Sequence, residues 1–245
     1  MKESSDRNDN YIKSLQENNE LAKDYYTKSI VKTEQQKFLD TLLLEKNRQF
    51  SSIADIACGG GTLSFHLKKL FPSAIFSLSD FNDDALKIAS AINGDVNFQY
   101  SKENIYQLSF PDNSFDLVCC WQTLSWLDDP EKALSELTRI TKPNGLIFAS
   151  SLFNLDHEVD IFAKLHDYTR IGAQVGTSYN TYSSTSIKKW LEGKVKNSFI
   201  HSFIPEIDFG YDGKGLGTFT INSEKGRLQV PAGYLMNWGI LEIQK

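Results

Sequence analysis

Three consecutive glycines follow an acid and a short apolar run in the stretch DIACGGGTL, residues 55–63. Glycine has no Cβ, so Gly59, Gly60 and Gly61 let the backbone approach a ligand closely, although each costs about 0.5–1 kcal/mol relative to alanine in regular structure. The first N–H groups of a helix that follows such a turn are free to donate to a carboxylate or a phosphate. This stretch therefore predicts a ligand-binding turn.

A second acid, Asp80, stands 19 residues after Gly61, where the next apolar run ends. A carboxylate there can accept from both hydroxyls of a ribose, and charge-assisted hydrogen bonds of this kind contribute about 1.5–3 kcal/mol each. The alternative is that Asp80 caps the following helix. The pair favours a cofactor with an adenosine part. A nicotinamide cofactor is favoured less, because Ser64 occupies the place of the third glycine in G-x-G-x-x-G.

The elements that would position these residues alternate between strand and helix. The strands are apolar on both faces, which is typical of a parallel sheet covered on both sides. Ligands bind such a sheet at the carboxyl ends of its strands, so the glycine turn and Asp80 should meet there. Strands are expected at 51–58, 73–80, 95–101, 115–121 and 146–153, helices at 62–71, 82–91 and 128–140, and a turn at 142–145.

Both ends of the chain depart from this alternation. From Tyr25 to Leu44, apolar residues recur at three- and four-residue spacing, which predicts a helix with one buried face. Beyond residue 153, helices are expected at 160–171 and 184–193. Strand-like runs at 198–209, 217–223 and 237–245 should add antiparallel strands to the same sheet.

Composition narrows the class of protein. The chain has 245 residues, 40% of them apolar, which is enough for one large domain. A net charge of −5 argues against nucleic acid, and Lys188, Lys189, Lys194 and Lys196 are expected to be solvated helix ends. We expect no membrane partner, a cytoplasmic location and no metal, because no targeting segment, long apolar run or metal-ligand spacing is found. The three cysteines, Cys58, Cys119 and Cys120, are expected to be reduced.

The motifs between residues 50 and 155 resemble those of class I S-adenosylmethionine-dependent methyltransferases of the small-molecule type. The resemblance is carried by ADIACGGGTLSFHL, by SLSDFNDDALKIA, and by the segment from NFQYS to IFAS at 97–150. It implies an α/β fold, with a Rossmann-like doubly wound seven-stranded sheet that is mostly parallel and has antiparallel C-terminal strands. It also implies an N-terminal helical cap at 1–45 and a methyltransferase domain at 46–245. Within that domain, 46–155 would bind the cofactor and 156–245 would supply substrate-side helices and the terminal strands.

Carried over residue by residue, the resemblance predicts a site for S-adenosylmethionine. Asp55 and the turn would lie under its methionine end, Asp80 would hold the ribose, and Phe81 and Ile105 would line the adenine. Ala57 replaces the usual first glycine, and Asn104 replaces an acid at the adenine amino group. Trp121 and Gln122 would border the sulfonium, and Tyr26 would cover it as part of a lid. The expected cofactor-binding residues are Tyr26, Asp55, Ala57, Cys58, Gly59, Gly61, Asp80, Phe81, Asn104, Ile105, Trp121 and Gln122.

Methyl transfer is an in-line displacement, so positioning supplies much of the acceleration. A base is needed only where the acceptor loses a proton, and His157 is the first candidate because it follows the fifth strand. Other candidates are His166, Tyr179, Tyr182 and His201, and the substrate side is expected to include Tyr11, Trp126 and Tyr168. We expect a monomer or homodimer that methylates O or N of a small molecule, with a sugar as one candidate. A degenerate, non-catalytic interaction subunit and a nicotinamide-dependent oxidoreductase are the alternatives.

Overall fold

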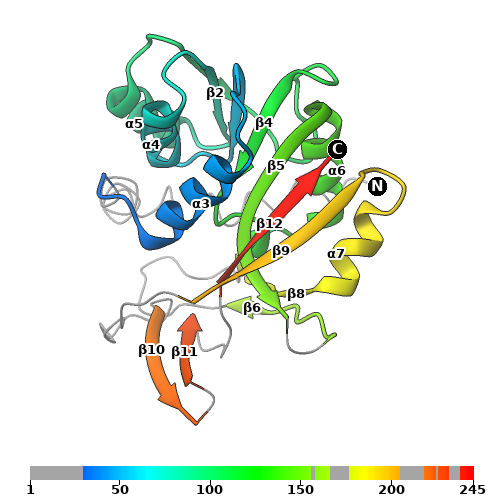
Figure 1. Cartoon of the computed structure of the whole chain (residues 1–245). Helices are drawn as coiled ribbons and strands as arrows, with labels where there is room; N and C mark the ends of the chain where they lie inside the picture. The colour runs from blue at the N-terminus through cyan, green and yellow to red at the C-terminus, as the bar shows by residue number, and fades with distance from the viewer. Residues whose placement is uncertain (1–29, 156–157, 166–176, 205–217, 225, 232–237) are drawn as a thin grey trace.

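A computed structural model describes residues 30–155, 158–165, 177–204, 218–224, 226–231 and 238–245 (Figure 1). The main sheet is built from β1 (Ser52–Ile56), β2 (Ile75–Asp80), β3 (Phe98–Lys102), β4 (Phe115–Cys120), β5 (Thr141–Asn154), β9 (Asn197–Phe203) and β12 (Trp238–Gln244). Their order is β3-β2-β1-β4-β5-β12-β9, and a short strand, β8 (Tyr182–Ser183), also pairs with β5. The strands β1 to β5 run parallel, whereas β12 is antiparallel to both of its neighbours. The expected doubly wound sheet with an antiparallel C-terminal strand is confirmed.

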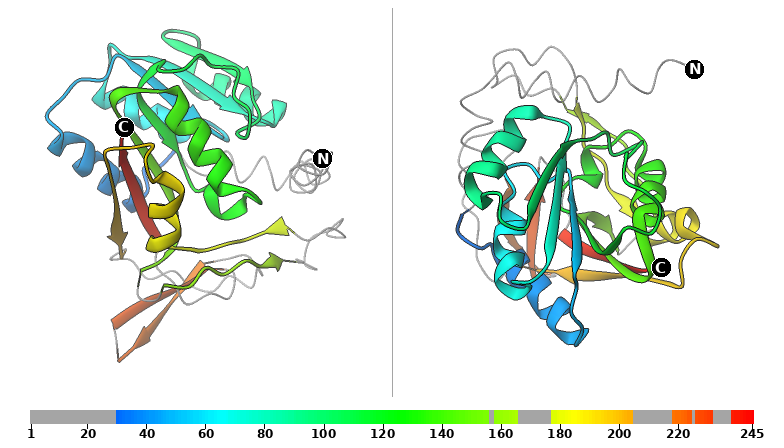
Figure 2. Two further views of the ribbon diagram at one scale, coloured as in Figure 1. Left: turned by 90° about the vertical axis from the view of Figure 1, so that its right-hand side faces the viewer. Right: turned by 90° about the horizontal axis from the view of Figure 1, so that it is seen from above.

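Helices cover both faces of this sheet (Figure 2). One face packs against α3 (Glu34–Glu45), α4 (Thr62–Leu70) and α5 (Asp83–Asn93), and the other against α6 (Pro130–Ile140) and α7 (Ser184–Leu191). Neighbouring residues of a strand point to opposite faces of the sheet. Cys119 therefore lies in the core on the α3, α4 and α5 face, and Cys120 in the core on the α6 and α7 face. Both thiols and that of Cys58 are free, as expected.

Capping residues in the sequence set where α5 and α6 begin and where α5 ends. Asn82 caps α5 by accepting from the Asp84 N–H at 2.9 Å, and Gly94 ends that helix with a positive φ of 68°. Asp129 caps α6 with Pro130 at its first position. Both starts put helix N-termini next to strand ends, where the site is expected.

The helix before β1 begins later than the predicted Tyr25. Within the described residues it starts at Glu34, since Thr33 and Gln36 form a reciprocal capping box. Ile30 and Val31, which we expected to be buried, are 55% and 80% exposed. The buried face of α3 is made instead by Leu39, Leu42 and Leu43.

Three other expectations were wrong, and the third of them is that residues 217–223 would add a strand to the main sheet. The turn at 142–145 is part of β5, because Asn144 takes a left-handed φ of 63° and a register shift accommodates the extra residues. Residues 160–165 are not helical. They contain β6 (Lys164–Leu165), which pairs with β7 (Thr177–Ser178), and Ile161 exchanges backbone hydrogen bonds with Thr181. The remaining strands, β10 (Thr218–Ser223) and β11 (Gly226–Pro231), form a separate hairpin.

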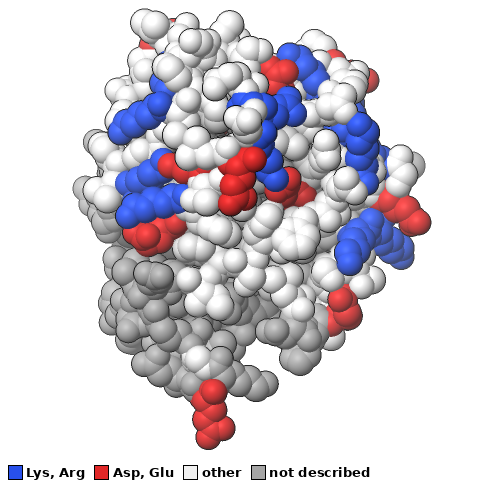
Figure 3. Space-filling view, in the orientation of Figure 1, with Lys and Arg blue, Asp and Glu red and all other residues white. Residues whose placement is uncertain are grey.

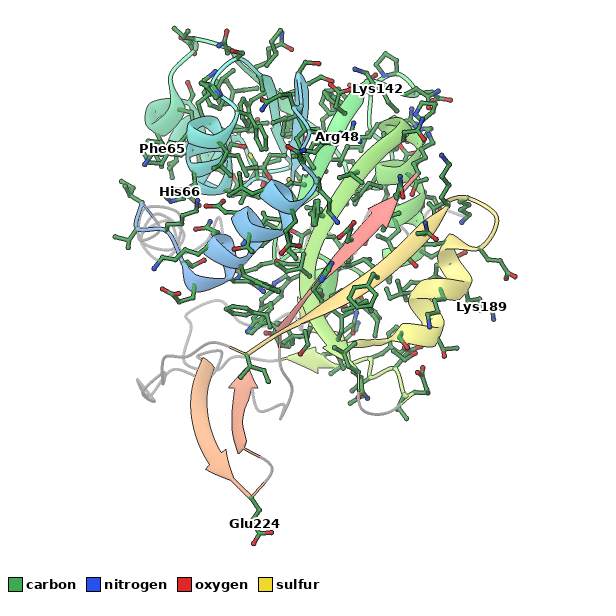
Figure 4. The ribbon with its side chains drawn as sticks, in the orientation of Figure 1. Arg48, Phe65, His66, Lys142, Lys189 and Glu224 are labelled. Atoms are coloured by element: carbon green, nitrogen blue, oxygen red, sulfur yellow. The ribbon has the colours of Figure 1, made fainter. Side chains whose placement is uncertain are left out.

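The amino ends of the parallel strands are tied together by polar contacts. Arg48 donates to the Asn144 carbonyl at 2.7 Å, and Lys142 pairs with Asp116 at 3.1 Å (Figure 4). Asp116 also accepts from the backbone N–H groups of Ser51 and Ser52. This end of the sheet is therefore fixed, and the opposite end carries the turn and the acids described next.

The charge pattern gives no sign of a polyanion-binding surface on the face drawn in Figure 3, where Lys and Arg alternate with Asp and Glu. Lys188 and Lys189 lie exposed in the last turn of α7, and Figure 4 shows Lys189 on this helix. In the described ranges, none of the helices has the length and apolarity that a membrane crossing requires.

Candidate functional site

The glycine turn joins β1 to α4 and is held in a left-handed backbone conformation. Gly59 and Gly61 have φ of 53° and 71°, and Ala57 adopts 57° although it carries a side chain. A Cβ on Gly61 would stand 2.7 Å from Asn93 Nδ2 and 2.9 Å from the Ala89 Cβ. Asn93 Nδ2 also donates to the Gly61 carbonyl at 3.0 Å. Helix α5 thus packs against the turn and leaves no space for a side chain at position 61, so glycine is the residue that fits there.

Asp80 ends β2 and organises the turn from the other side. Its Oδ2 accepts from the Gly59 N–H and its Oδ1 from the Asn82 N–H, both at 2.9 Å. Each carboxylate oxygen can accept a second hydrogen bond, so Asp80 can still bind two hydroxyls. Burial raises the pKa of Asp80, while the N–H groups of Asn82, Gly59 and Phe81 lower it. The expected meeting of the turn and Asp80 is confirmed.

Asp55 lies fully buried under the turn. Its Oδ2 accepts a 2.7 Å hydrogen bond from Ser64, and its Oδ1 has no partner among the described residues. Burial raises the pKa of Asp55 to about 7, the negative charge of Asp80 adds to this rise, and Ser64 opposes it. From the sequence, Ser64 was noted only as a missing glycine. Its place one turn into α4, facing β1, was the signal that could have identified it.

Cys58 is not a candidate nucleophile. Burial and the nearby carboxylates of Asp55 and Asp80 raise its pKa well above the ordinary value, so the thiol stays protonated. Its backbone N–H donates to the Ser79 carbonyl at 2.9 Å. Cys58 therefore contributes a small side chain and a fixed backbone to the turn.

The expected adenine side lies at the ends of β2 and β3. Phe81 is half-buried, with Lys102 Nζ 5.8 Å from its ring centroid. Asn104 Oδ1 already accepts from the Tyr106 N–H at 2.9 Å, and Ile105 is buried in the core that packs on α6. The roles of Phe81, Asn104 and Ile105 toward adenine stay predictions.

Tyr106 is a further residue that the sequence motifs did not single out. Its buried hydroxyl accepts from the N–H groups of Asp128 at 3.0 Å and Asp129 at 3.3 Å. It thereby joins the loop after β3 to the segment before α6.

The expected sulfonium side begins where β4 ends. Trp121 packs half-buried against the core on the α3 face. Gln122 has a left-handed φ of 52°, and its N–H donates to Ser150 Oγ at 2.8 Å. Its side-chain Nε2 donates to Gln35 Oε1 on α3 at 3.3 Å. The N-terminal helix α3 therefore reaches the end of β4 directly.

The expected acceptor side begins at the short helix η1 (Leu124–Trp126). The Trp126 ring lies 4.6 Å from that of Tyr179, at 61°. Asn180 fixes this pair, because its N–H donates to the Ser125 carbonyl at 2.7 Å and its Nδ2 to the Leu127 carbonyl at 3.0 Å.

Several expected residues take no part in the described site. Tyr182 is fully buried and donates to the Leu124 carbonyl at 2.9 Å, while His201 pairs with Glu242 at 2.9 Å within the sheet. Five predicted site residues lie outside the described residues: Tyr11, Tyr26, His157, His166 and Tyr168.

The residues present fit S-adenosylmethionine better than a metal. Within the described ranges, no three His, Cys, Asp or Glu side chains come together as metal ligands do. A glycine turn, an Asp80 carboxylate with spare acceptor capacity and an Asp55 oxygen without a partner among the described residues suit an uncharged ribose next to a cationic amino-acid end.

The fold is of the Rossmann-like kind found in class I S-adenosylmethionine-dependent methyltransferases. Residues 54–149 match the family model described as a methyltransferase domain, and the chain carries such a domain. It is 30% identical to an uncharacterised methyltransferase of Schizosaccharomyces pombe, over 66% of this chain and 63% of that protein.

Two further proteins are similar to this chain, one in sequence and one in fold. The chain is 26% identical to a malonyl-[acyl-carrier protein] O-methyltransferase of Hahella chejuensis, over 71% of this chain and 62% of the relative. The chain thus spans slightly less than two thirds of both relatives. A crystal structure of the Burkholderia thailandensis 1,6-didemethyltoxoflavin-N1-methyltransferase, with its substrate and S-adenosylhomocysteine bound, superposes with a TM-score of 0.64 at 10% identity. It covers 100% of this chain and 91% of that one.

Proposed function

We propose that this protein transfers the methyl group of S-adenosylmethionine to an O or N atom of a small-molecule acceptor. The observation that carries the proposal is the Asp80 carboxylate, which holds the glycine turn through Gly59 and keeps acceptor capacity for a ribose. The methyltransferase-domain match over residues 54–149 supports it independently.

The bound cofactor supplies an activated methyl group, and the residues of this chain supply position. Asp80 would hold the ribose, and the Gly59–Gly61 turn would let the backbone contact the cofactor closely. Trp121 and Gln122 would border the transferred methyl, with Gln122 fixed by Ser150 and Gln35. Holding both reactants in line can supply about 7–11 kcal/mol of a barrier. An acceptor hydroxyl would need a base, for which His157 remains the predicted residue.

The acceptor is proposed to carry a ring. The half-buried Trp126 ring packs against the buried Tyr179 at the expected acceptor side, and aromatic faces bind sugars and planar heterocycles. The two relatives with named activities methylate O and N, respectively, in molecules of different kinds. A sugar or a nitrogen heterocycle is thus the acceptor class that we propose, in a cytoplasmic monomer or homodimer.

The test is methyl transfer itself. The protein is incubated with S-adenosylmethionine carrying an isotope-labelled methyl, together with a panel of sugars, hydroxylated aromatics and nitrogen heterocycles. We expect a labelled product by mass spectrometry with the wild type and none with Asp80→Ala. Cofactor binding without any labelled product would favour the alternative of a non-catalytic interaction subunit. The oxidoreductase alternative predicts NADH binding in the same measurement.

A further inference from the structure

Gln35 lies in the first turn of α3 and is 5% exposed. The capping box between Thr33 and Gln36 fixes this turn, because Gln36 N–H donates to Thr33 Oγ1 at 3.2 Å and Thr33 N–H to Gln36 Oε1 at 3.0 Å. The Gln35 side chain therefore leaves a rigid helix start and points to the end of β4, where its Oε1 accepts from Gln122.

Gln122 places this contact at the carboxyl edge of the sheet. It follows β4, whose Cys119 pairs with Asp55 of β1, so Gln122 and the glycine turn leave neighbouring strands at the same edge. Its own backbone is fixed by Ser150 on the next strand at 2.8 Å. Gln35 thus borders the predicted sulfonium side although it belongs to a helix that precedes the whole domain match.

The Gln35 amide is only half satisfied. Its Nε2 is buried and has no hydrogen-bond partner among the described residues. Leaving such a donor unpaired is unfavourable, so a buried, unpaired donor in a fixed side chain calls for an acceptor from elsewhere. Asp55 Oδ1, under the glycine turn, is a buried acceptor in the same condition.

A free donor and a free anionic acceptor at one edge complement a zwitterion. An α-amino acid offers a carboxylate for the donor and an ammonium for the acceptor, and the cofactor has such an end. We propose that Gln35 binds the carboxylate of the methionine part of S-adenosylmethionine through Nε2. This assignment rests on the proposed function. It makes Gln35 a cofactor-binding residue contributed by the helix before the domain.

The test compares two ligands that differ in the amino-acid end. S-Adenosylhomocysteine has it and 5′-methylthioadenosine lacks it, so their affinity ratio reports on this contact alone. Calorimetry on the full chain with Gln35→Met should show about 10-fold weaker binding of S-adenosylhomocysteine and unchanged binding of 5′-methylthioadenosine. Gln35→Glu should weaken S-adenosylhomocysteine further, since two carboxylates repel.

Gln99→Met is the control, because it makes the same change at an exposed position of β3 and leaves the start of α3 intact. It should leave the ratio of the two affinities unchanged. If Gln35→Met weakens the binding of both ligands equally, or of neither, the assignment is overturned while the proposed function stands. The same result is expected if Nε2 instead bonds an oxygen of the acceptor. A wild type that binds neither ligand overturns the proposed function and the assignment with it.

Discussion

The Ser64 hydroxyl donates to Asp55 Oδ2 at 2.7 Å, and both side chains are fully buried. Helix α4 is thereby joined to the end of β1 directly beneath the glycine turn. Ser64, which departs from the nicotinamide-binding motif in the sequence, therefore holds the Asp55 carboxyl in place.

Replacing Ser64 by Ala should leave Asp55 buried without a partner. We expect the free energy of unfolding to fall by about 1–3 kcal/mol, the cost of an unsatisfied buried polar group. Urea unfolding measures it, with Ser90→Ala on the half-buried side of α5 as the control. Equal stabilities of the Ser64→Ala protein and the wild type would show that this hydrogen bond contributes nothing.

Ala57 adopts a left-handed φ of 57°, a conformation that costs a residue with a Cβ about 1–2 kcal/mol. Ala57→Gly should therefore stabilise the protein by up to about 1 kcal/mol, after the greater entropy of glycine in the unfolded chain is subtracted. Ala91→Gly, at an exposed position of α5, should destabilise it by about 1 kcal/mol. Two shifts of the same sign in the urea midpoint would contradict the strained geometry at Ala57.

The three glycines should differ in their tolerance of a side chain. Gly61→Ala should destabilise by about 3 kcal/mol or more, because its Cβ would stand 2.7 Å from Asn93 Nδ2 and φ is 71°. Gly60, which is not among the positive-φ residues of the described chain, should accept Ala. Thermal unfolding of both variants checks this, and a Gly60→Ala protein as unstable as Gly61→Ala would refute the difference.

The burial of Asp55 predicts a dependence of stability on pH. Its pKa rises from 3.8 unfolded to about 7 folded, so the folded state binds more protons between these values. Stability from this group is therefore present below about pH 4 and is lost as the pH rises toward 7. The wild type should lose about 2–4 kcal/mol more between pH 4 and pH 8 than Asp55→Asn does.

Urea unfolding across that pH range measures the difference. Asp95→Asn, which changes an exposed carboxyl, should follow the wild type. Parallel curves for the wild type and Asp55→Asn would mean that Asp55 ionises in the folded protein as easily as in the unfolded chain.

Much of the fold follows from local signals. The caps at Asn82 and Asp129 and the apolar strands predicted α5, α6 and the parallel sheet, because these signals act within a few residues. The apolar spacing at residues 160–165 predicted a helix wrongly. The backbone of these residues instead forms hydrogen bonds with residues 177–181, and no local pattern reveals such a distant pairing. The start of α3 was missed because Ile30 and Val31 fit a helical spacing, while the capping box at Thr33 decides the boundary.

The site divides in the same way. The turn and Asp80 could be predicted, since a glycine turn and an acid at the carboxyl ends of neighbouring parallel strands are typical of a ligand-binding edge. Gln35 and Tyr106 could not be predicted, because their contacts with Gln122 and with the segment before α6 each join separate elements.

Binding of S-adenosylhomocysteine, measured by calorimetry, tests the central claim that the turn and Asp80 form the cofactor site. The wild type and Asp83→Ala, which changes an exposed neighbouring acid paired with Lys102, should bind alike. Asp80→Ala should lose about 100-fold or more in affinity, because two charge-assisted hydrogen bonds to the ribose contribute about 1.5–3 kcal/mol each. A wild type that does not bind, or an Asp80→Ala protein that binds as well as the wild type, would contradict it.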